Sequence, residues 1–143
     1  MSITSANAIL TLSQPVLFPT PVQLQGFAAD DIYDFEQVRT LEALMGVDGI
    51  LSFGFVFAER LQNITLQADS ASNDFFDTIM TQQIAAKDAY PLNGTIILDG
   101  IQTMFTMTNG GLLMYNPAPA AKRVLQPRRF QVVWNSVFPA PIA

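Results

Sequence analysis

The stretch Asp48-Gly49-Ile50-Leu51-Ser52-Phe53-Gly54-Phe55-Val56-Phe57 decides the fold class of this chain. Every second residue from Leu51 to Phe57 is a leucine or a phenylalanine, and such period-2 alternation is typical of a β-strand with one apolar face. The preceding dipeptide, Asp48-Gly49, favours a type I′ turn between two paired strands. We therefore expect a long β-hairpin with its tip at Asp48-Gly49.

The residues before this turn, from Tyr33 to Val47, are interpreted as the first strand of the hairpin. Their apolar pattern alone does not choose between helix and strand, since Leu41, Leu44 and Met45 also fit a helical stripe. The turn signal and the strand that follows it favour the strand. Because side chains alternate between the two faces of a strand, one face would be mostly apolar and the other acidic. The acidic side chains of that second face are Asp34, Glu36 and Glu42.

The middle of the chain predicts one helix. Leu61 to Gln67 is typical of a short strand, and Ser70 and Ser72 then provide good helix N-caps. Apolar residues recur at three- and four-residue spacing over about residues 72 to 89, and Pro91 is expected to end the helix.

The second half of the chain predicts several short strands. Turn signals at Asn93-Gly94, Asp99-Gly100 and Asn109-Gly110-Gly111 would separate strands at 95–98, 101–108 and 112–115. A final strand is expected from Arg128 to Val137, after the proline-containing connector 117–121. With seven or eight strands around one helix, the prediction is a mainly β (α+β) fold, an antiparallel sandwich or barrel with one flanking helix, in a single domain 1–143.

Residues 1 to 30 are expected to form an extended arm or an edge segment. Pro15, Pro19 and Pro21 exclude a helix there and disfavour a central strand. The sequence leaves open, at even odds, whether this segment packs on its own domain or on a neighbouring subunit.

Composition narrows the classes of function. The chain has no Cys and no His, which removes disulfides, thiolate metal sites and the side chain best suited to proton transfer near neutral pH. Charged residues are only 13% while hydrophobic residues are 50%, as expected if much of the surface is covered by neighbouring subunits. We expect a structural protein with no catalytic residue, cofactor or metal.

Charge and hydropathy also bear on partners. A net charge of −5 opposes nonspecific binding to nucleic-acid phosphates. No apolar run is long enough for membrane insertion, and the first residues lack the pattern of a signal peptide, so synthesis in the cytoplasm is expected. A calcium role for Asp30-Asp31 with Asp34 and Glu36 is weighed, but the spacing fits no EF-hand loop.

Four of the seven basic residues are concentrated within eight positions. We interpret them as partners in salt bridges to an acidic face of a neighbouring subunit, rather than as a nucleic-acid patch. These residues are Lys122, Arg123, Arg128 and Arg129.

Two segments resemble parts of bacteriophage tail tube proteins. They are Leu66-Gln67-Ala68-Asp69-Ser70, followed by a Phe-rich helix, and Leu125-Gln126-Pro127-Arg128-Arg129-Phe130, followed by Trp134. The Asp48-Gly49 hairpin tip precedes both in the expected order. The similarity extends from about Tyr33 to Pro139, and it indicates a tail tube protein of a long-tailed phage of the contractile type.

The resemblance implies hexameric rings that stack into a hollow tube, in which two long hairpins from each subunit join a barrel around the lumen. The hairpin from Tyr33 to Phe57 is the candidate for one of them, and Thr95 to Tyr115 is the weaker candidate for part of the other. Asp34, Glu36 and Glu42 would then line the lumen, where an acidic wall keeps DNA from adhering during ejection.

The implied partners are copies of the same chain, the tail sheath, the baseplate or tube initiator and the tape measure protein, with DNA passing through unbound. The implied location is the virion, after synthesis in the host cytoplasm. Alternatives are a tube-end adaptor or terminator ring, a phage-like secretion tube, and a monomeric β module that binds carbohydrate or protein.

Overall fold

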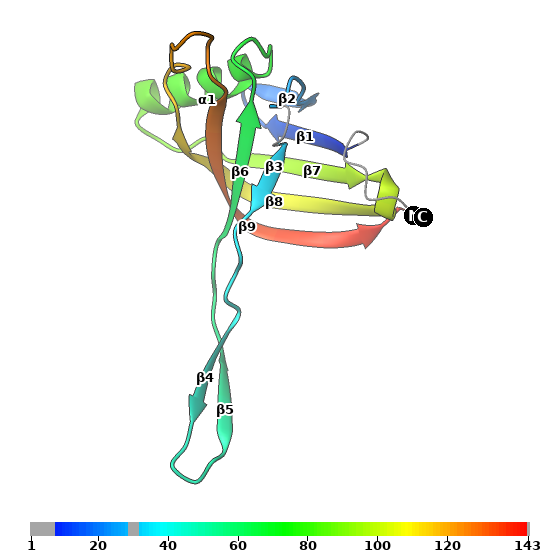
Figure 1. The fold of residues 1–143 in the computed structure, drawn as a ribbon, viewed down its shortest axis with the longest axis vertical. Helices are drawn as coiled ribbons and strands as arrows, with labels where there is room; N and C mark the ends of the chain where they lie inside the picture. The colour runs from blue at the N-terminus through cyan, green and yellow to red at the C-terminus, as the bar shows by residue number, and fades with distance from the viewer. Residues whose placement is uncertain (1–7, 29–31, 143) are drawn as a thin grey trace.

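The structure is a computed structural model that describes residues 8–28 and 32–142. Within them the chain forms one α-helix, one short 3-10 turn and nine strands, seven of which make an antiparallel sheet in the order β2-β1-β7-β8-β9-β6-β3. The two remaining strands, β4 and β5, form a separate hairpin that extends far from the sheet (Figure 1). The elements are β1 Ala8–Gln14, β2 Phe18–Gln23, β3 Tyr33–Phe35, β4 Leu41–Met45, β5 Leu51–Phe55, β6 Arg60–Leu66, α1 Asn73–Ala86, β7 Leu92–Leu98, η1 Asp99–Ile101, β8 Thr103–Tyr115 and β9 Arg128–Pro141.

The expected mainly β fold with one helix is confirmed, but the sheet does not close into a barrel. Its end strands, β2 and β3, are not paired with each other. The chain between them, from Gln25 to Ala28, runs along the end of β6 on the side away from β9. There Gln67 N–H donates to Gly26 O at 2.8 Å, and Ala28 N–H donates to Thr65 O at 3.2 Å. The sheet is therefore strongly curled, with a bridging segment in place of a closing strand.

The two longest strands, β8 and β9, bend together at mid-length. In Figure 1, β9 begins upright beside β6 and ends horizontally beside β8. Asn109 lies at this bend with a φ of 49°, and a Cβ at Gly110 would lie only 2.3 Å from Trp134 Cε3. The predicted turn at Asn109-Gly110-Gly111 is thus wrong: these residues stay within β8, and Gly110 makes room for the indole.

The other two turn predictions have opposite outcomes. The hairpin at Asp99-Gly100 is confirmed, because β7 and β8 pair on either side of η1. The turn at Asn93-Gly94 is wrong, since both residues belong to β7. Gly94 is needed for close packing there: a Cβ would lie 2.6 Å from Leu12 Cδ2.

The N-terminal segment is only partly the edge that we expected. Strand β1 is an interior strand between β2 and β7, with Leu10 and Leu12 fully buried, so the prediction of an arm is wrong for these residues. They pack on their own domain. Pro19 and Pro21 do lie in an edge strand, β2, as their missing N–H groups require. The predictions for residues 1–7 and 29–31, including any role of Asp30 and Asp31, lie outside the described residues.

The predicted helix is confirmed as α1, with different ends. It stops at Ala86 because Lys87 adopts a left-handed conformation with a φ of 52°, well before Pro91. Its buried face contacts the sheet, where the ring of Phe76 stacks on Phe130 with centroids 4.3 Å apart. Ser72 does not cap the helix; its Oγ instead accepts the N–H of Gln25 at 2.8 Å and fixes the bridging segment.

Candidate assembly surface

The expected hairpin is present, but it is built from shorter strands. The first strand does not run unbroken from Tyr33, because β3 pairs with β6 in the large sheet and the chain is irregular from 36 to 40 before β4 begins. Strands β4 and β5 then pair from Leu41 opposite Phe55 to Met45 opposite Leu51. The hairpin therefore stands clear of the sheet on two extended connections (Figure 1).

The tip lies at Asp48-Gly49 as predicted, with a different turn. Gly49 N–H donates to Gly46 O at 3.0 Å, and Gly46 N–H donates to Ile50 O at 2.9 Å. Gly49 has a φ of +83°, whereas Asp48 is not among the residues of positive φ, so the type I′ prediction is wrong. Asp48 instead stabilises the loop through its Oδ1, which accepts the N–H of Ile50 at 3.1 Å.

One face of the hairpin is apolar and uncovered. The register places Leu41 beside Phe55, Ala43 beside Phe53 and Met45 beside Leu51, so these side chains share one face. All of them are exposed, and Phe53 and Phe55 keep 64% and 67% of their surface accessible. Burying one such side chain stabilises a complex by about 1.5–3 kcal/mol, so this face has the composition of an interface.

The backbone of the hairpin also offers free hydrogen-bonding groups. Val56 N–H donates to Thr40 O and Gly46 N–H to Ile50 O, so the even-numbered residues of β4 and β5 face each other across the ribbon. The odd-numbered residues consequently direct their N–H and C=O groups outward along both edges. The outward groups belong to Leu41, Ala43 and Met45 on one edge and to Leu51, Phe53 and Phe55 on the other. Of these, the C=O of Leu41 already accepts a hydrogen bond from Arg39 Nε at 3.2 Å.

The three acidic residues expected on this hairpin are exposed, but they lie on different elements of the structure. Asp34 lies in β3 opposite Asn63, in the large sheet. Glu36 follows β3, with its N–H donating to Leu61 O at 3.0 Å. Only Glu42 lies in the projecting ribbon, opposite Gly54 on the less apolar face. Their position on a lumen wall stays a prediction.

An open groove of about 670 Å³ lies where the hairpin joins the sheet. Phe55 and Phe57 line it from the hairpin, and Ser136 and Phe138 line it from β9. The rings of Phe55 and Phe57 meet edge to face at 4.9 Å. The groove thus places two exposed rings of the hairpin near Phe138 in the second half of β9, with Glu59 and Arg60 also in its lining. No sequence pattern indicated this juxtaposition.

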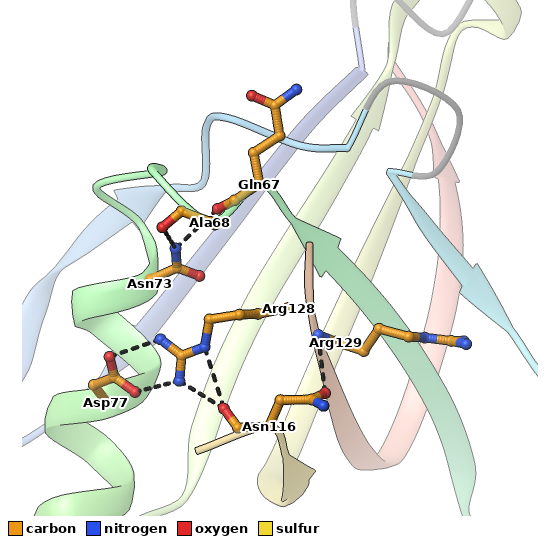
Figure 2. A network of polar contacts seen from close by, with 7 residues as sticks. All are labelled: Gln67, Ala68, Asn73, Asp77, Asn116, Arg128 and Arg129. Atoms are coloured by element: carbon orange, nitrogen blue, oxygen red, sulfur yellow. Dashed lines mark hydrogen bonds and ion pairs between the residues drawn. The ribbon is translucent and has the colours of Figure 1, made fainter. Parts of the chain in front are cut away.

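The four clustered basic residues do not act as one group. Arg128 binds Asp77 of α1 through two hydrogen bonds of 2.7 and 2.9 Å, and its Nη2 also donates to Asn116 O at 2.8 Å (Figure 2). The Arg128 side chain is 5% exposed, and its hydrogen bonds to the Asp77 carboxylate raise the pKa of its guanidinium. The prediction that Arg128 serves a neighbouring subunit is therefore wrong, because its guanidinium is satisfied within the chain.

Lys122, Arg123 and Arg129 have no acidic partner within salt-bridge distance in the described part of the chain. All three are exposed, and Figure 2 shows the side chain of Arg129 directed away from the Arg128 network. Their pairing with a neighbouring subunit stays a prediction.

Comparison with known proteins identifies the family. The profile of a family described as "Tail fiber protein gp32" matches residues 1–138. The chain belongs to the tail fiber protein gp32 family. The resemblance to phage tail proteins drawn from the sequence is thereby confirmed at that level, while a search of curated protein sequences finds no significant match.

Solved structures with the fold of this gp32-family chain come from contractile injection systems. The anti-feeding prophage cap, described as its tube terminating cap, is 11% identical with a TM-score of 0.60, over 99% of this chain and 92% of that chain. A chain of the PVC sheath-tube complex in its extended state is 9% identical with a TM-score of 0.60, over 97% and 91% of the two chains. A chain of the anti-feeding prophage baseplate is 9% identical with a TM-score of 0.56, over 99% and 97%. At these identities the likeness establishes the fold.

The single helix of the described region, α1, is too short and too polar to cross a membrane.

Proposed function

We propose that the chain is a non-enzymatic structural subunit of a phage tail, which assembles with copies of itself into hexameric rings stacked as a tail tube. The observation that carries this proposal is the β4–β5 hairpin, whose apolar face is exposed and whose two edges keep unpaired backbone groups. An open strand edge and an exposed apolar face both promote association with other chains in water, and a specific partner that covers them prevents nonspecific aggregation. Membership of a tail protein family and the fold of tube, cap and baseplate components support the same assignment.

In the proposed ring, the outer edge of β4 pairs with the outer edge of β5 in the next subunit. Closing the ring pairs every hairpin edge, which removes the free edges altogether. The apolar face then packs against the bodies of the subunits, and the opposite face, with Glu42, is directed to the lumen. Asp34 and Glu36 continue the acidic lining where the hairpin meets the sheet, so DNA passes without binding.

A ring at the end of the tube is the second candidate, because one structural neighbour is a tube terminating cap and another a sheath/tube terminator. Stacking distinguishes the two roles: a tube subunit polymerises into long tubes, whereas a terminator forms single rings. A subunit of a phage-like secretion tube would share all the features of the tube subunit, with sheath and baseplate proteins as further partners in each case.

The decisive experiment removes one outward donor from the hairpin. Ala43→Pro deletes an N–H of the outer edge of β4 without touching the hydrogen bonds between β4 and β5. Ala43→Val, which keeps the N–H and suits a strand, is the matched control. Rings and tubes are counted by electron microscopy and mass photometry, and circular dichroism checks the fold of both variants.

We expect Ala43→Val to assemble and Ala43→Pro to stay monomeric with an unchanged fold. Normal assembly of Ala43→Pro would exclude edge pairing of the hairpins. A cryo-EM map of the assembled wild type tests the lumen separately: carboxylates of Asp34, Glu36 and Glu42 on the outer wall would end the proposed lining role.

A further inference from the structure

The large sheet has free strand edges of its own, besides those of the hairpin. A free edge presents N–H and C=O groups with which a strand of another chain can pair. In the described part of the sheet, β2 and β3 are the end strands. The second half of β9 is a further edge, because β6 accompanies β9 only from Arg128 to Trp134.

In the second half of β9, prolines occupy the outward positions. Ile142 N–H donates to Gln102 O at 3.1 Å, so the even-numbered peptide groups face β8. Asn135 O points the other way, where it accepts from Arg60 Nη1 at 3.4 Å. By alternation, Val137, Pro139 and Pro141 also face outward, and the two prolines have no N–H to offer.

The outer edge of β2 has the same character. Leu24 N–H donates to Leu10 O at 2.9 Å and Val22 pairs with Leu12, so these alternate residues face β1. Pro21, next to Val22, therefore faces outward. Pro19 lies where the register of β1 and β2 shifts between Leu12 and Gln14, and it removes another donor from the six-residue strand. A strand docking on either edge would leave carbonyl groups without partners, at about 1–3 kcal/mol for each buried group.

The other free edges of the sheet are short or irregular. Strand β3 has only three residues, and β8 beyond Gly110 is interrupted by a register shift between Leu112 and Met114. Bulges and short strands both hinder pairing with another chain. The hairpin differs from all of these edges, since β4 and β5 are regular, contain no proline and keep their outward donors.

We propose that the prolines of β2 and β9 close the large sheet to strand addition, so that strand pairing between copies of this chain is confined to the β4–β5 hairpin. The hairpin half of this inference rests on the proposed function, whereas the closure of the two edges does not. Closure has a physical purpose in a protein that assembles by strand pairing: a second open edge would compete with the hairpin and give branched or irregular aggregates.

The test restores the missing donors. The double variants Pro139→Thr with Pro141→Thr, and Pro19→Thr with Pro21→Thr, place N–H groups back on the two edges with a residue suited to strands. Pro117→Thr, in the exposed connector after β8, is the matched control. We expect each double variant to form at least tenfold more branched or irregular particles in electron micrographs than wild type at the same concentration, while Pro117→Thr gives only the regular particles of wild type.

Folded double variants that form only the regular assemblies of wild type would overturn the proposal. If the variants do not fold, the proposal can be tested on the wild type alone by amide hydrogen exchange before and after assembly. The Val137 amide should exchange equally in both states, and the amides of Ala43 and Phe53 should become protected. Protection of Val137 on assembly would show that the β9 edge is paired, and would also refute closure.

The two proposals can fail separately. If Ala43→Pro assembles normally but the proline double variants aggregate, the closure of the β2 and β9 edges is supported and the pairing of the hairpins is refuted. If Ala43→Pro stays monomeric and the double variants do not aggregate, the pairing of the hairpins is supported and the closure of the β2 and β9 edges is refuted.

Discussion

The β4–β5 hairpin and the bend of β8 and β9 are built from similar sequence, yet one is wholly exposed and the other is the centre of the core. In β5, Leu51, Phe53 and Phe55 alternate with small residues and all stay accessible. In β9, Phe130, Val132 and Trp134 alternate with other residues in the same period and are fully buried. The same alternation therefore forms the core of the subunit at the bend and leaves an accessible apolar face on the hairpin, which is the face that the proposed ring would cover.

The largest effect on stability is expected from filling the space under Trp134. Gly110→Ala places a Cβ about 2.3 Å from the indole, and the indole cannot move freely because its Nε1–H donates to Gln62 Oε1 at 2.9 Å. We expect a loss of about 3 kcal/mol in the free energy of unfolding, as for other overpacked cores. Urea unfolding of the unassembled subunit measures it.

Gly111→Ala is the matched control, because nothing lies within 4 Å of a Cβ at that position. It should change stability by about 0.5 kcal/mol or less. Equal losses for the two variants would mean that backbone freedom, and not contact with Trp134, explains the glycine.

A smaller loss is expected from Asp77→Asn, which leaves the guanidinium of Arg128 buried beside a neutral amide. Because Asp77 is 42% exposed, water partly compensates, and we expect about 2 kcal/mol in urea unfolding. Because the pKa of Arg128 is raised, its guanidinium stays charged at neutral and acidic pH. Titration of Arg128 should therefore not change the stability contributed by the ion pair in that pH range. Arg129→Gln, next in sequence but exposed, serves as control; a loss as large as that of Asp77→Asn would argue against the ion pair.

The smallest effect on stability, with the largest effect on assembly, is expected from Phe53→Ser combined with Phe55→Ser. Both rings are about two thirds exposed in the subunit, so unfolding should change by about 0.5 kcal/mol or less. Ring formation should nevertheless be lost, because the double variant removes the apolar face that is buried in the proposed ring. Sedimentation velocity with urea unfolding checks both statements, and a destabilised subunit or unaltered rings would contradict the division of roles between hairpin and bend.

Local signals predicted the elements that depend on neighbouring residues. The helix, the projecting hairpin and the edge position of Pro19 and Pro21 follow from periodicity, turn residues and a missing N–H. The same signals failed at Asn93-Gly94 and Asn109-Gly110, where glycine serves close packing instead of a turn. A Cβ there would meet Leu12 or Trp134, which lie far along the chain, and no local pattern records that contact.

The candidate surface shows the same limit. The sequence predicted the hairpin and its apolar alternation. It also led us to group Arg128 with its exposed basic neighbours, whereas in the structure Arg128 forms an ion pair with Asp77 of α1. The sequence also did not indicate the groove that Phe55, Phe57 and Phe138 line together, since Phe138 lies about 80 residues further along the chain and no local pattern relates it to the other two.

Composition and local periodicity were enough to predict a mainly β fold with one helix, a projecting hairpin and the absence of cysteine and histidine chemistry. Which apolar strand is buried, which is left exposed and which prolines face outward became known only from the packing of the folded chain. Alternating apolar residues predict that a strand has an apolar face. Whether that face is buried depends on which other parts of the chain pack against it. In this protein the chain covers the apolar face of β9 and leaves that of the β4–β5 hairpin uncovered.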